Sequence, residues 1–274
     1  MGELMSETDD SAEMQDVSHA FVASNLGYTI DGVEILSNVS LNFPSGEMVA
    51  LVGHNGSGKS SLLKILARQL SPTSGSVLHE GRDLKSYHNR SFARSVAYLP
   101  QDLSAGSDMT IRELVSCGRY PWHGALGRFS DLDRDKVEAA ILATHLEAFA
   151  DRVVGTLSGG ERQRAWIAML IAQDARCLLL DEPTAALDIA HQVEVLSLVR
   201  RLAHEAGISV VIVLHDINMA ARFCDRIHAL KSGRVVASDK PEAILVPDRL
   251  RSIYGINMAV VTAPDLSYRL AYPL

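Results

Sequence analysis

The sequence predicts an α/β fold built around a parallel sheet whose carboxyl edge handles phosphate. Four short apolar runs, at residues 48–52, 96–99, 177–180 and 209–214, lack polar alternation and are typical of strands covered on both faces. Each run ends at polar residues, and in open parallel sheets the ligand crevice lies beyond the carboxyl ends of the strands. The first run also leads into a glycine-rich loop followed by leucines at helical spacing. We therefore expect several polar segments to meet at one edge of one sheet.

Length and composition limit the organisation and the possible functions. With 274 residues, the chain fits one large α/β domain with an insertion, or two small domains. Its net charge of −7, from 26 basic and 33 acidic residues, argues against nucleic acid as a partner. Three widely spaced cysteines lack metal-ligand spacing and favour a reduced, intracellular setting. No apolar run approaches the ~18 residues of a transmembrane helix and no signal peptide is recognised, so we expect a soluble protein.

The first segment of the chain is an acidic tail. Residues 1–20 contain six carboxylates, no lysine or arginine and few large apolar side chains. Such a composition cannot offset the entropy lost on ordering, so we expect residues 1–19 to be disordered. The first six letters match the N-myristoylation pattern, but one acyl chain anchors weakly without a basic patch, and this tail is acidic.

The loop after the first apolar run matches the nucleoside-triphosphate P-loop in full. It consists of Gly53, His54, Asn55, Gly56, Ser57, Gly58, Lys59 and Ser60. The glycines let backbone N–H groups converge on phosphates, Lys59 reaches the β and γ phosphates, and Ser60 supplies a hydroxyl to Mg²⁺. A flexible glycine turn is the alternative. The strand before the loop and a helix predicted at residues 59–70 favour nucleotide binding instead.

A second glycine-rich segment, at residues 157–163, opens a predicted helix but contains no lysine. Its small residues Ser158, Gly159 and Gly160 look built to hold the same kind of phosphate. This asymmetry suggests that one nucleotide contacts both segments.

Polar residues also follow the other apolar runs. Asp181 is placed to hold Mg²⁺ through water, and the neighbouring Glu182 to orient or deprotonate an attacking water, although a capping or solvated acid pair is the alternative. His215 is expected to contact the γ-phosphate and steady that water, and Gln101 to sense Mg²⁺ and the γ-phosphate. A lone histidine at a strand end is more often structural, but here all these strands should end at the same edge.

The order of these motifs resembles the ATP-binding cassette (ABC) ATPases over roughly residues 20 to 240, and the Ser158-Gly159-Gly160 signature separates that family from other P-loop proteins. The resemblance implies a P-loop, RecA-like core with an antiparallel β subdomain and a helical subdomain inserted at about residues 102–156. ATP and Mg²⁺ are the implied ligands. The implied organisation is a tail at 1–19, an ATPase domain at 20–256, and a C-terminal tail at 257–274 that stays unassigned.

The resemblance also implies a head-to-tail dimer with a second copy of the chain. Ser158, Gly159 and Gly160 would contact the γ-phosphate bound by the partner's P-loop, and residues 186–188, which end at Asp188, would form the D-loop that communicates between the two sites. The family places an aromatic before the P-loop to stack on adenine. That position aligns best with Ile30, while Tyr28 takes the role if the loop carries a small insertion. Ser61 replaces the usual threonine, which is harmless because Ser60 is the metal hydroxyl.

The segment between Gln101 and the signature is predicted to be helical, with helices at residues 110–119 and 133–150. The resemblance implies that this subdomain and the Gln101 loop form a groove for a short helix of a membrane subunit. Residues 118–129 hold three aromatics and arginine on an irregular segment, as interface anchors do, whereas core packing is the alternative.

The same run, with residues 214–222, is similar to the ATPase subunits of iron-chelate importers, closest to the ferric hydroxamate siderophore systems. The implied protein is a peripheral ATPase on the cytoplasmic face of the cytoplasmic (inner) membrane. Its implied partners are permease subunits and, indirectly, a siderophore-binding protein. Importers of haem, cobalamin or zinc are the nearest alternatives. A soluble ABC protein of DNA repair or the ribosome, or a non-hydrolysing regulatory module, is more distant; Glu182 argues against the last.

Overall fold

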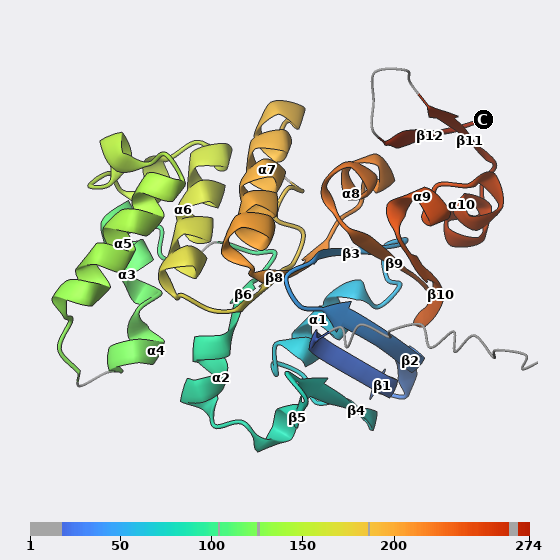
Figure 1. Ribbon diagram of the computed structural model, residues 1–274, viewed down its shortest axis with the longest axis horizontal. Coiled ribbons are helices and arrows are strands. Elements are labelled where there is room, and N and C mark those ends of the chain that lie inside the picture. Colours follow the sequence, from blue (N-terminus) through green and yellow to red (C-terminus); the bar gives the residue numbers. More distant parts are fainter. Residues whose placement is uncertain (1–17, 104, 125–126, 186, 263–267) are drawn as a thin grey trace, which may run out of the picture.

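The computed structural model describes residues 18–103, 105–124, 127–185, 187–262 and 268–274, and within these ranges the larger sheet has six strands (Figure 1). In spatial order they are β10 (Arg234–Asp239), β9 (Arg226–Lys231), β3 (Met48–Val52), β8 (Ser209–Val213), β7 (Cys177–Leu180) and β6 (Val96–Leu99). All neighbours pair in parallel except β10, which runs antiparallel to β9 at one edge. The acidic tail lies outside the described residues up to residue 17, and β1 begins at His19, the last residue of its predicted range.

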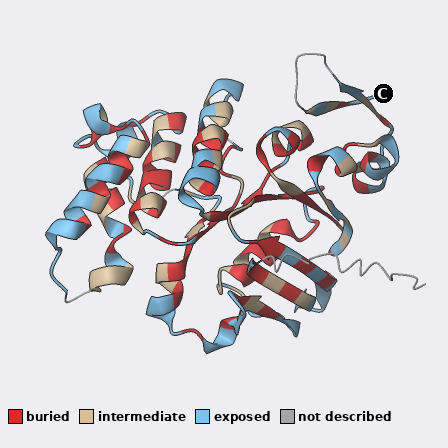
Figure 2. Cartoon of the chain, viewed as in Figure 1, coloured by how far each residue is buried: buried red, intermediate tan, exposed pale blue. Residues whose placement is uncertain are grey.

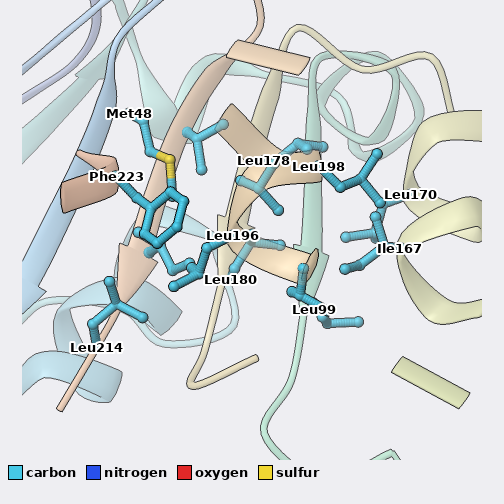
Figure 3. Close-up of a cluster of buried hydrophobic side chains, with 14 of the residues drawn as sticks. Met48, Leu99, Ile167, Leu170, Leu178, Leu180, Leu196, Leu198, Leu214 and Phe223 are labelled. Atoms are coloured by element: carbon cyan, nitrogen blue, oxygen red, sulfur yellow. The ribbon is translucent and has the colours of Figure 1, made fainter. Parts of the chain in front are cut away.

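Both faces of this sheet are buried, as the unbroken apolar runs predict. In β3, Met48, Ala50 and Val52 face one core, while Val49 and Leu51 face a second core. The first core packs the sheet against helices and includes the side chains drawn in Figure 3. Figure 2 shows the result as a band of buried strands between helices whose outer faces are exposed. Because consecutive side chains of a strand point to opposite faces, an apolar run without alternation is what such a sheet requires.

The second core lies between the larger sheet, α1 (Lys59–Leu66) and a smaller antiparallel sheet. The smaller sheet has the order β2 (Val33–Pro44), β1 (His19–Ile30), β4 (Ser74–His79) and β5 (Arg82–Asp83), followed by η1 (Leu84–Ser86) and α2 (Asn89–Ser95). An α/β core beside an antiparallel sheet is the fold class expected from the sequence.

The helix predicted at residues 59–70 ends at Leu66, four residues early. Arg68 adopts a left-handed φ of 58°, and the amide of Gln69 bonds back to the Lys64 carbonyl, which closes the helix. Leu70 still packs against the second core. The leucine spacing that predicted a longer helix therefore reflects one apolar face that continues past the helix end.

Helices gather at one end of the molecule (Figure 1). They are α3 (Ile111–Cys117), α4 (Tyr120–His123), α5 (Asp131–Ala143), η2 (Glu147–Phe149), η3 (Val154–Thr156) and α6 (Gly159–Ala172). The helix predicted at 110–119 is shorter, with Thr110 as its N-cap. The helix predicted at 133–150 is wrong at both ends: Ser130 caps its start, and His145, with a left-handed φ of 56°, follows its end.

The aromatic run at residues 118–129 divides between its two predicted roles. Trp122 donates its Nε1–H to the Gln173 carbonyl at 2.7 Å and stacks under Arg94, so it joins α4 to the α/β core. Tyr120 and Phe129 are 56% and 40% exposed and stay available to a partner. Residues 125 and 126 of the run lie outside the described residues.

Arg119 and Asp133 form a buried ion pair that holds α3, α5 and α6 together. Arg119 Nε donates to Asp133 Oδ1 at 2.8 Å, and its Nη1 donates to the Ala172 carbonyl. Burial alone would raise the pKa of Asp133, but hydrogen bonds from Ser130 and the Arg119 guanidinium hold that pKa at about 2. The carboxylate is therefore charged in the folded protein and depends on its partner.

Arg119→Ala is expected to lower the free energy of unfolding by about 3–5 kcal/mol, because it leaves a buried carboxylate without its partner. Arg134→Ala is the matched control, since the Arg134–Asp131 pair is solvent-exposed and such pairs contribute at most about 1 kcal/mol. Urea unfolding of both variants measures the difference. Similar losses in the two variants would contradict this role for Arg119.

The remaining helices connect the sheet strands and extend the chain past them. They are α7 (Ile189–Ala206), α8 (Ile217–Phe223), α9 (Pro241–Ile244) and α10 (Pro247–Tyr254). The unassigned segment after Asn257 forms a hairpin of β11 (Met258–Thr262) and β12 (Arg269–Pro273), which lies beside α8 and α10 in Figure 1. Leu250, Ile253, Met258 and Ala271 belong to the first core, so this segment is integral to the fold.

Candidate active site

The P-loop wraps from the end of β3 into α1. Gly53 has a φ of 139°, and a Cβ there would lie 2.1 Å from the Leu230 carbonyl oxygen, so no other residue fits. Gly58 is the N-cap of α1 in a left-handed conformation. Lys59 Nζ donates to the carbonyls of Gly53 and His54 at 2.9 and 2.8 Å, which places the ammonium inside the loop. The loop thus combines a positive charge with the amino end of a helix.

Lys59 is buried, and desolvation lowers its pKa from the ordinary lysine value. The charges of Glu182 and Asp181 partly oppose this shift. An ammonium with little water around it interacts strongly with an incoming phosphate. Because the charges of Asp181 and Glu182 act on Lys59, the end of β7 lies close to the P-loop.

Asp181 lies at the end of β7 and points at the P-loop. Ser60 Oγ donates to Asp181 Oδ1 at 2.8 Å, and the Tyr98 hydroxyl lies 3.5 Å from the other carboxylate oxygen. Burial raises the pKa of Asp181, and the Ser60 hydrogen bond opposes that rise. Mg²⁺ prefers oxygen ligands and is usually held by one or two protein groups together with substrate phosphates and water. This oxygen pair fits such an ion, and among the described residues no larger cluster of acidic, histidine or cysteine ligands competes with it.

Glu182 is the centre of a three-residue cluster. Gln101 Nε2 donates to Glu182 Oε2 at 2.7 Å, and His215 Nε2 lies 2.7 Å from Glu182 Oε1. Glu182 has a left-handed φ of 51°, a strained conformation that is often found at functional sites. The structure therefore brings together the residues that follow β6, β7 and β8.

These residues line one open pocket of 460 Å³. Its walls are Ile35, Asn55, Gly56, Gly58, Lys59, Ser60, Ser61, Gln101, Glu182 and His215. Neither adenine candidate is among these lining residues: Tyr28 packs against the second core, and Ile30 is exposed at the end of β1. Ile35 of β2 is among the lining residues. No sequence motif marks Ile35, and the adenine contact of Tyr28 or Ile30 stays a prediction.

The lysine-free segment opens α6. Ser158 is its N-cap, and Ser158 and Glu161 form a reciprocal capping box. Ser158 and Gly159 are exposed. None of Ser158, Gly159 and Gly160 is among the described residues that line the 460 Å³ pocket. The second glycine-rich segment thus exposes Ser158 and Gly159 to solvent and lies outside the pocket that contains Lys59, while Gly159 lines a neighbouring pocket with Gln101 and Glu182.

Asp188 caps the start of α7 and holds His191. Its Oδ1 accepts bonds from the His191 backbone N–H at 2.9 Å and from His191 Nδ1 at 2.8 Å, and these bonds lower the pKa of Asp188. The His191 ring covers Gly160, where a Cβ would lie 2.4 Å from the ring. His191 thus joins the predicted D-loop to the signature segment. No sequence motif marks it, and residue 186 of that loop lies outside the described residues.

Among the residues described by the structure, no helix is long and apolar enough to cross a membrane.

Comparison with known proteins identifies the family of this chain. The family model described as ABC transporter matches residues 36–185. The ATP-binding protein named for a siderophore transport system of Bacillus subtilis (strain 168) is 42% identical over 249 residues, 91% of this chain and 90% of the relative. The iron(3+)-hydroxamate import ATP-binding protein of that strain is 40% identical over 84% of this chain and 86% of the relative. A cobalamin import ATP-binding protein of Halobacterium salinarum is 39% identical over 92% of this chain and 63% of the relative.

Solved structures are similar over most of the chain. An inward-facing metal-chelate-type ABC transporter aligns with a TM-score of 0.82 and 26% identity, covering 93% of this chain and 98% of that one. A dimeric ATP-binding cassette in a post-hydrolysis state with ADP and Pi aligns with a TM-score of 0.71 and 30% identity, covering 81% of this chain and 98% of that one.

Proposed function

The chain belongs to the ABC transporter family, and we propose that it is the ATP-hydrolysing subunit of an importer for ferric siderophores of the hydroxamate type. The convergence of Gln101 and His215 on Glu182, in the pocket that contains Lys59, carries the ATPase part of this proposal. The relatives named for siderophore and iron(3+)-hydroxamate transport support the substrate class.

The P-loop and the polar residues that follow the strands have distinct tasks in ATP hydrolysis. The P-loop amides and Lys59 bind the phosphates, and Ser60, Asp181 and Gln101 would hold Mg²⁺. The ion supplies neutralisation of charge on the β and γ phosphate oxygens. Glu182 accepts a proton from the water that attacks the γ-phosphorus, and the bond from that phosphorus to the bridging oxygen of ADP breaks.

His215 and Gln101 set the geometry of this step. Both contact Glu182 carboxylate oxygens at 2.7 Å, so the base has few orientations left. A fixed base contributes to rate by proximity to the bound water. His215 also lies at the pocket wall, where it can donate to the γ-phosphate.

A second copy of the chain completes each site. Ser158 and Gly159 are exposed, and none of Ser158, Gly159 and Gly160 lines the pocket that contains Lys59, which supports assigning the three to the γ-phosphate held by the partner in a head-to-tail dimer. ATP favours the closed dimer because it contacts both copies, and hydrolysis removes that preference. Asp188, joined to Gly160 through His191, links the two sites.

The chain acts with membrane partners on the cytoplasmic face of the cytoplasmic (inner) membrane. Permease subunits form the substrate path and a siderophore-binding protein delivers the chelate. Tyr120 and Phe129, both exposed on the helical end of the molecule, are suited to contact the permease. A cobalamin importer is the second candidate, because a cobalamin import relative is 39% identical to this chain over 251 residues.

Uptake in cells tests the substrate. In cells lacking this chain, accumulation of radioactive iron from a ferric hydroxamate is expected to fall to background, and only the wild-type gene, not Glu182→Gln, should restore it. Cobalamin uptake should not change. Lost cobalamin uptake with normal iron accumulation would replace the siderophore proposal by the second candidate.

A further inference from the structure

The C-terminal segment contacts both the P-loop and the helix that follows His215. We propose that α10, β11 and β12, here called the C-terminal brace, position the P-loop and the His215 loop for ATP hydrolysis, with Tyr254 and Asn218 as the positioning residues. Because His215 is given a catalytic role here, the inference rests on the proposed function. It concerns a segment that carries no recognised motif.

The first contact joins the brace to the P-loop. His54 Nε2 donates to the Tyr254 carbonyl at 2.9 Å, and the two rings meet edge to face with centroids 5.7 Å apart. Tyr254 is the last residue of α10, and Gly255 follows in a left-handed cap. His54 precedes Lys59 by five residues and its own carbonyl accepts the Lys59 ammonium. The end of α10 therefore fixes the part of the loop that holds the lysine.

The second contact joins the brace to the helix that follows His215. The Asn218 side chain donates from Nδ2 to the Ala271 carbonyl at 3.0 Å and accepts from the Ala271 N–H at 2.8 Å. A neighbouring strand would make the same pair of bonds, so the Asn218 side-chain amide occupies a strand's place at the edge of β12. Asn218 lies in the first turn of α8, whose N-cap is Asp216, next to His215. A shift of α8 would move His215 directly.

Tyr254 also places a polar group inside the protein. The Tyr254 hydroxyl is buried without a hydrogen-bond partner among the described residues. Burial, and to a smaller extent the charge of Asp216, raises the pKa of Tyr254, so the hydroxyl stays protonated. Tyr254 thus contacts His54 of the P-loop and packs against the first core.

The brace is itself anchored in the core. Leu250 and Ile253 are fully buried, and Ala271 is buried where β12 packs against α8. Lys231 of β9 donates to the Ser252 carbonyl of α10. A rigid support on both loops explains why a strained base such as Glu182 can be held by His215 at hydrogen-bond distance.

Asn218→Ala removes both bonds to Ala271 and is expected to lower kcat for ATP hydrolysis about 10-fold with little change in KM, because small misplacements at a reacting centre are costly. Tyr272→Ala, on the neighbouring and half-exposed residue of β12, is the matched control and should keep the wild-type kcat. If Asn218→Ala unfolds, Asn218→Asp serves, since it keeps one bond and sets a carboxylate against the Ala271 carbonyl.

A double variant separates positioning from general loosening of the fold. In a His215→Ala background, Asn218→Ala should cause no further loss of kcat, since its effect passes through the histidine. An equal 10-fold loss in both backgrounds, or a normal kcat in Asn218→Ala, would overturn the role of Asn218.

The contact between His54 and Tyr254 is tested by the affinity for ATP. His54→Ala should raise the Kd for ATP several-fold, and Tyr254→Leu, which keeps the backbone carbonyl but removes the ring, should raise it by a smaller factor. Unchanged ATP affinity in both variants would overturn this half of the inference. A wild-type chain that hydrolyses no ATP would instead contradict the proposed function.

Discussion

Glu182→Gln is expected to slow ATP turnover by about 10²–10⁴-fold, the usual contribution of a positioned general base, while ATP stays bound. Lys59 bonds to the Gly53 carbonyl and Ser60 bonds to Asp181, and neither bond involves Glu182. The amide keeps an oxygen that can accept from Gln101 or His215. The closed dimer should therefore accumulate with ATP, as seen by sedimentation velocity.

Glu194→Gln is the matched control for this variant. Glu194 is an exposed carboxylate of α7 that pairs with Arg164, and its loss removes one negative charge outside the residues that line the pocket. It should hydrolyse ATP at the wild-type rate and form no persistent dimer. Normal turnover by Glu182→Gln would remove Glu182 as the base.

Ser158→Phe is expected to abolish hydrolysis and ATP-dependent dimer formation while the monomer keeps its affinity for ATP. The bulky side chain would stand where a second copy's γ-phosphate must approach. Ser158 is absent from the pocket of its own chain, so monomer binding should not change. Steady-state turnover and ATP titration of the monomer measure the two effects.

The substitution also removes the capping box of α6, which costs ~1 kcal/mol of stability. Ser130→Phe is the control for that cost, because Ser130 and Asp133 form the same box at α5. It should lose stability and keep turnover. If Ser158→Phe weakened ATP binding to the monomer as much as it slowed turnover, the segment would belong to its own chain's site.

Much of the site was predictable because it rests on local patterns. The P-loop follows a buried strand directly, and Asp181 and Glu182 follow another, so periodicity and the parallel-sheet rule suffice to place them at one edge. The apolar runs predicted all four strands because a doubly covered strand leaves few alternatives. Neither argument requires knowledge of distant contacts.

The parts that could not be predicted depend on distant residues or on backbone angles. Gln101 and Glu182 are 81 positions apart, and His54 and Tyr254 are 200 apart, so no local pattern records their bonds. The helix ends at Arg68 and His145 rest on left-handed non-glycine residues, which lack a strong sequence signal. The exposure of Ser158 likewise depends on how α6 packs in the fold, which no local pattern records.

Mixing two inactive variants tests the shared site most directly. One chain carries Lys59→Ala and the other Ser158→Phe, and each alone should hydrolyse no ATP. In a head-to-tail dimer of the two, one site joins an intact P-loop to an intact signature, so an equal mixture should recover roughly a quarter of wild-type turnover. A mixture no more active than its separate components would contradict the account, because a site contained within one chain cannot be restored by a second.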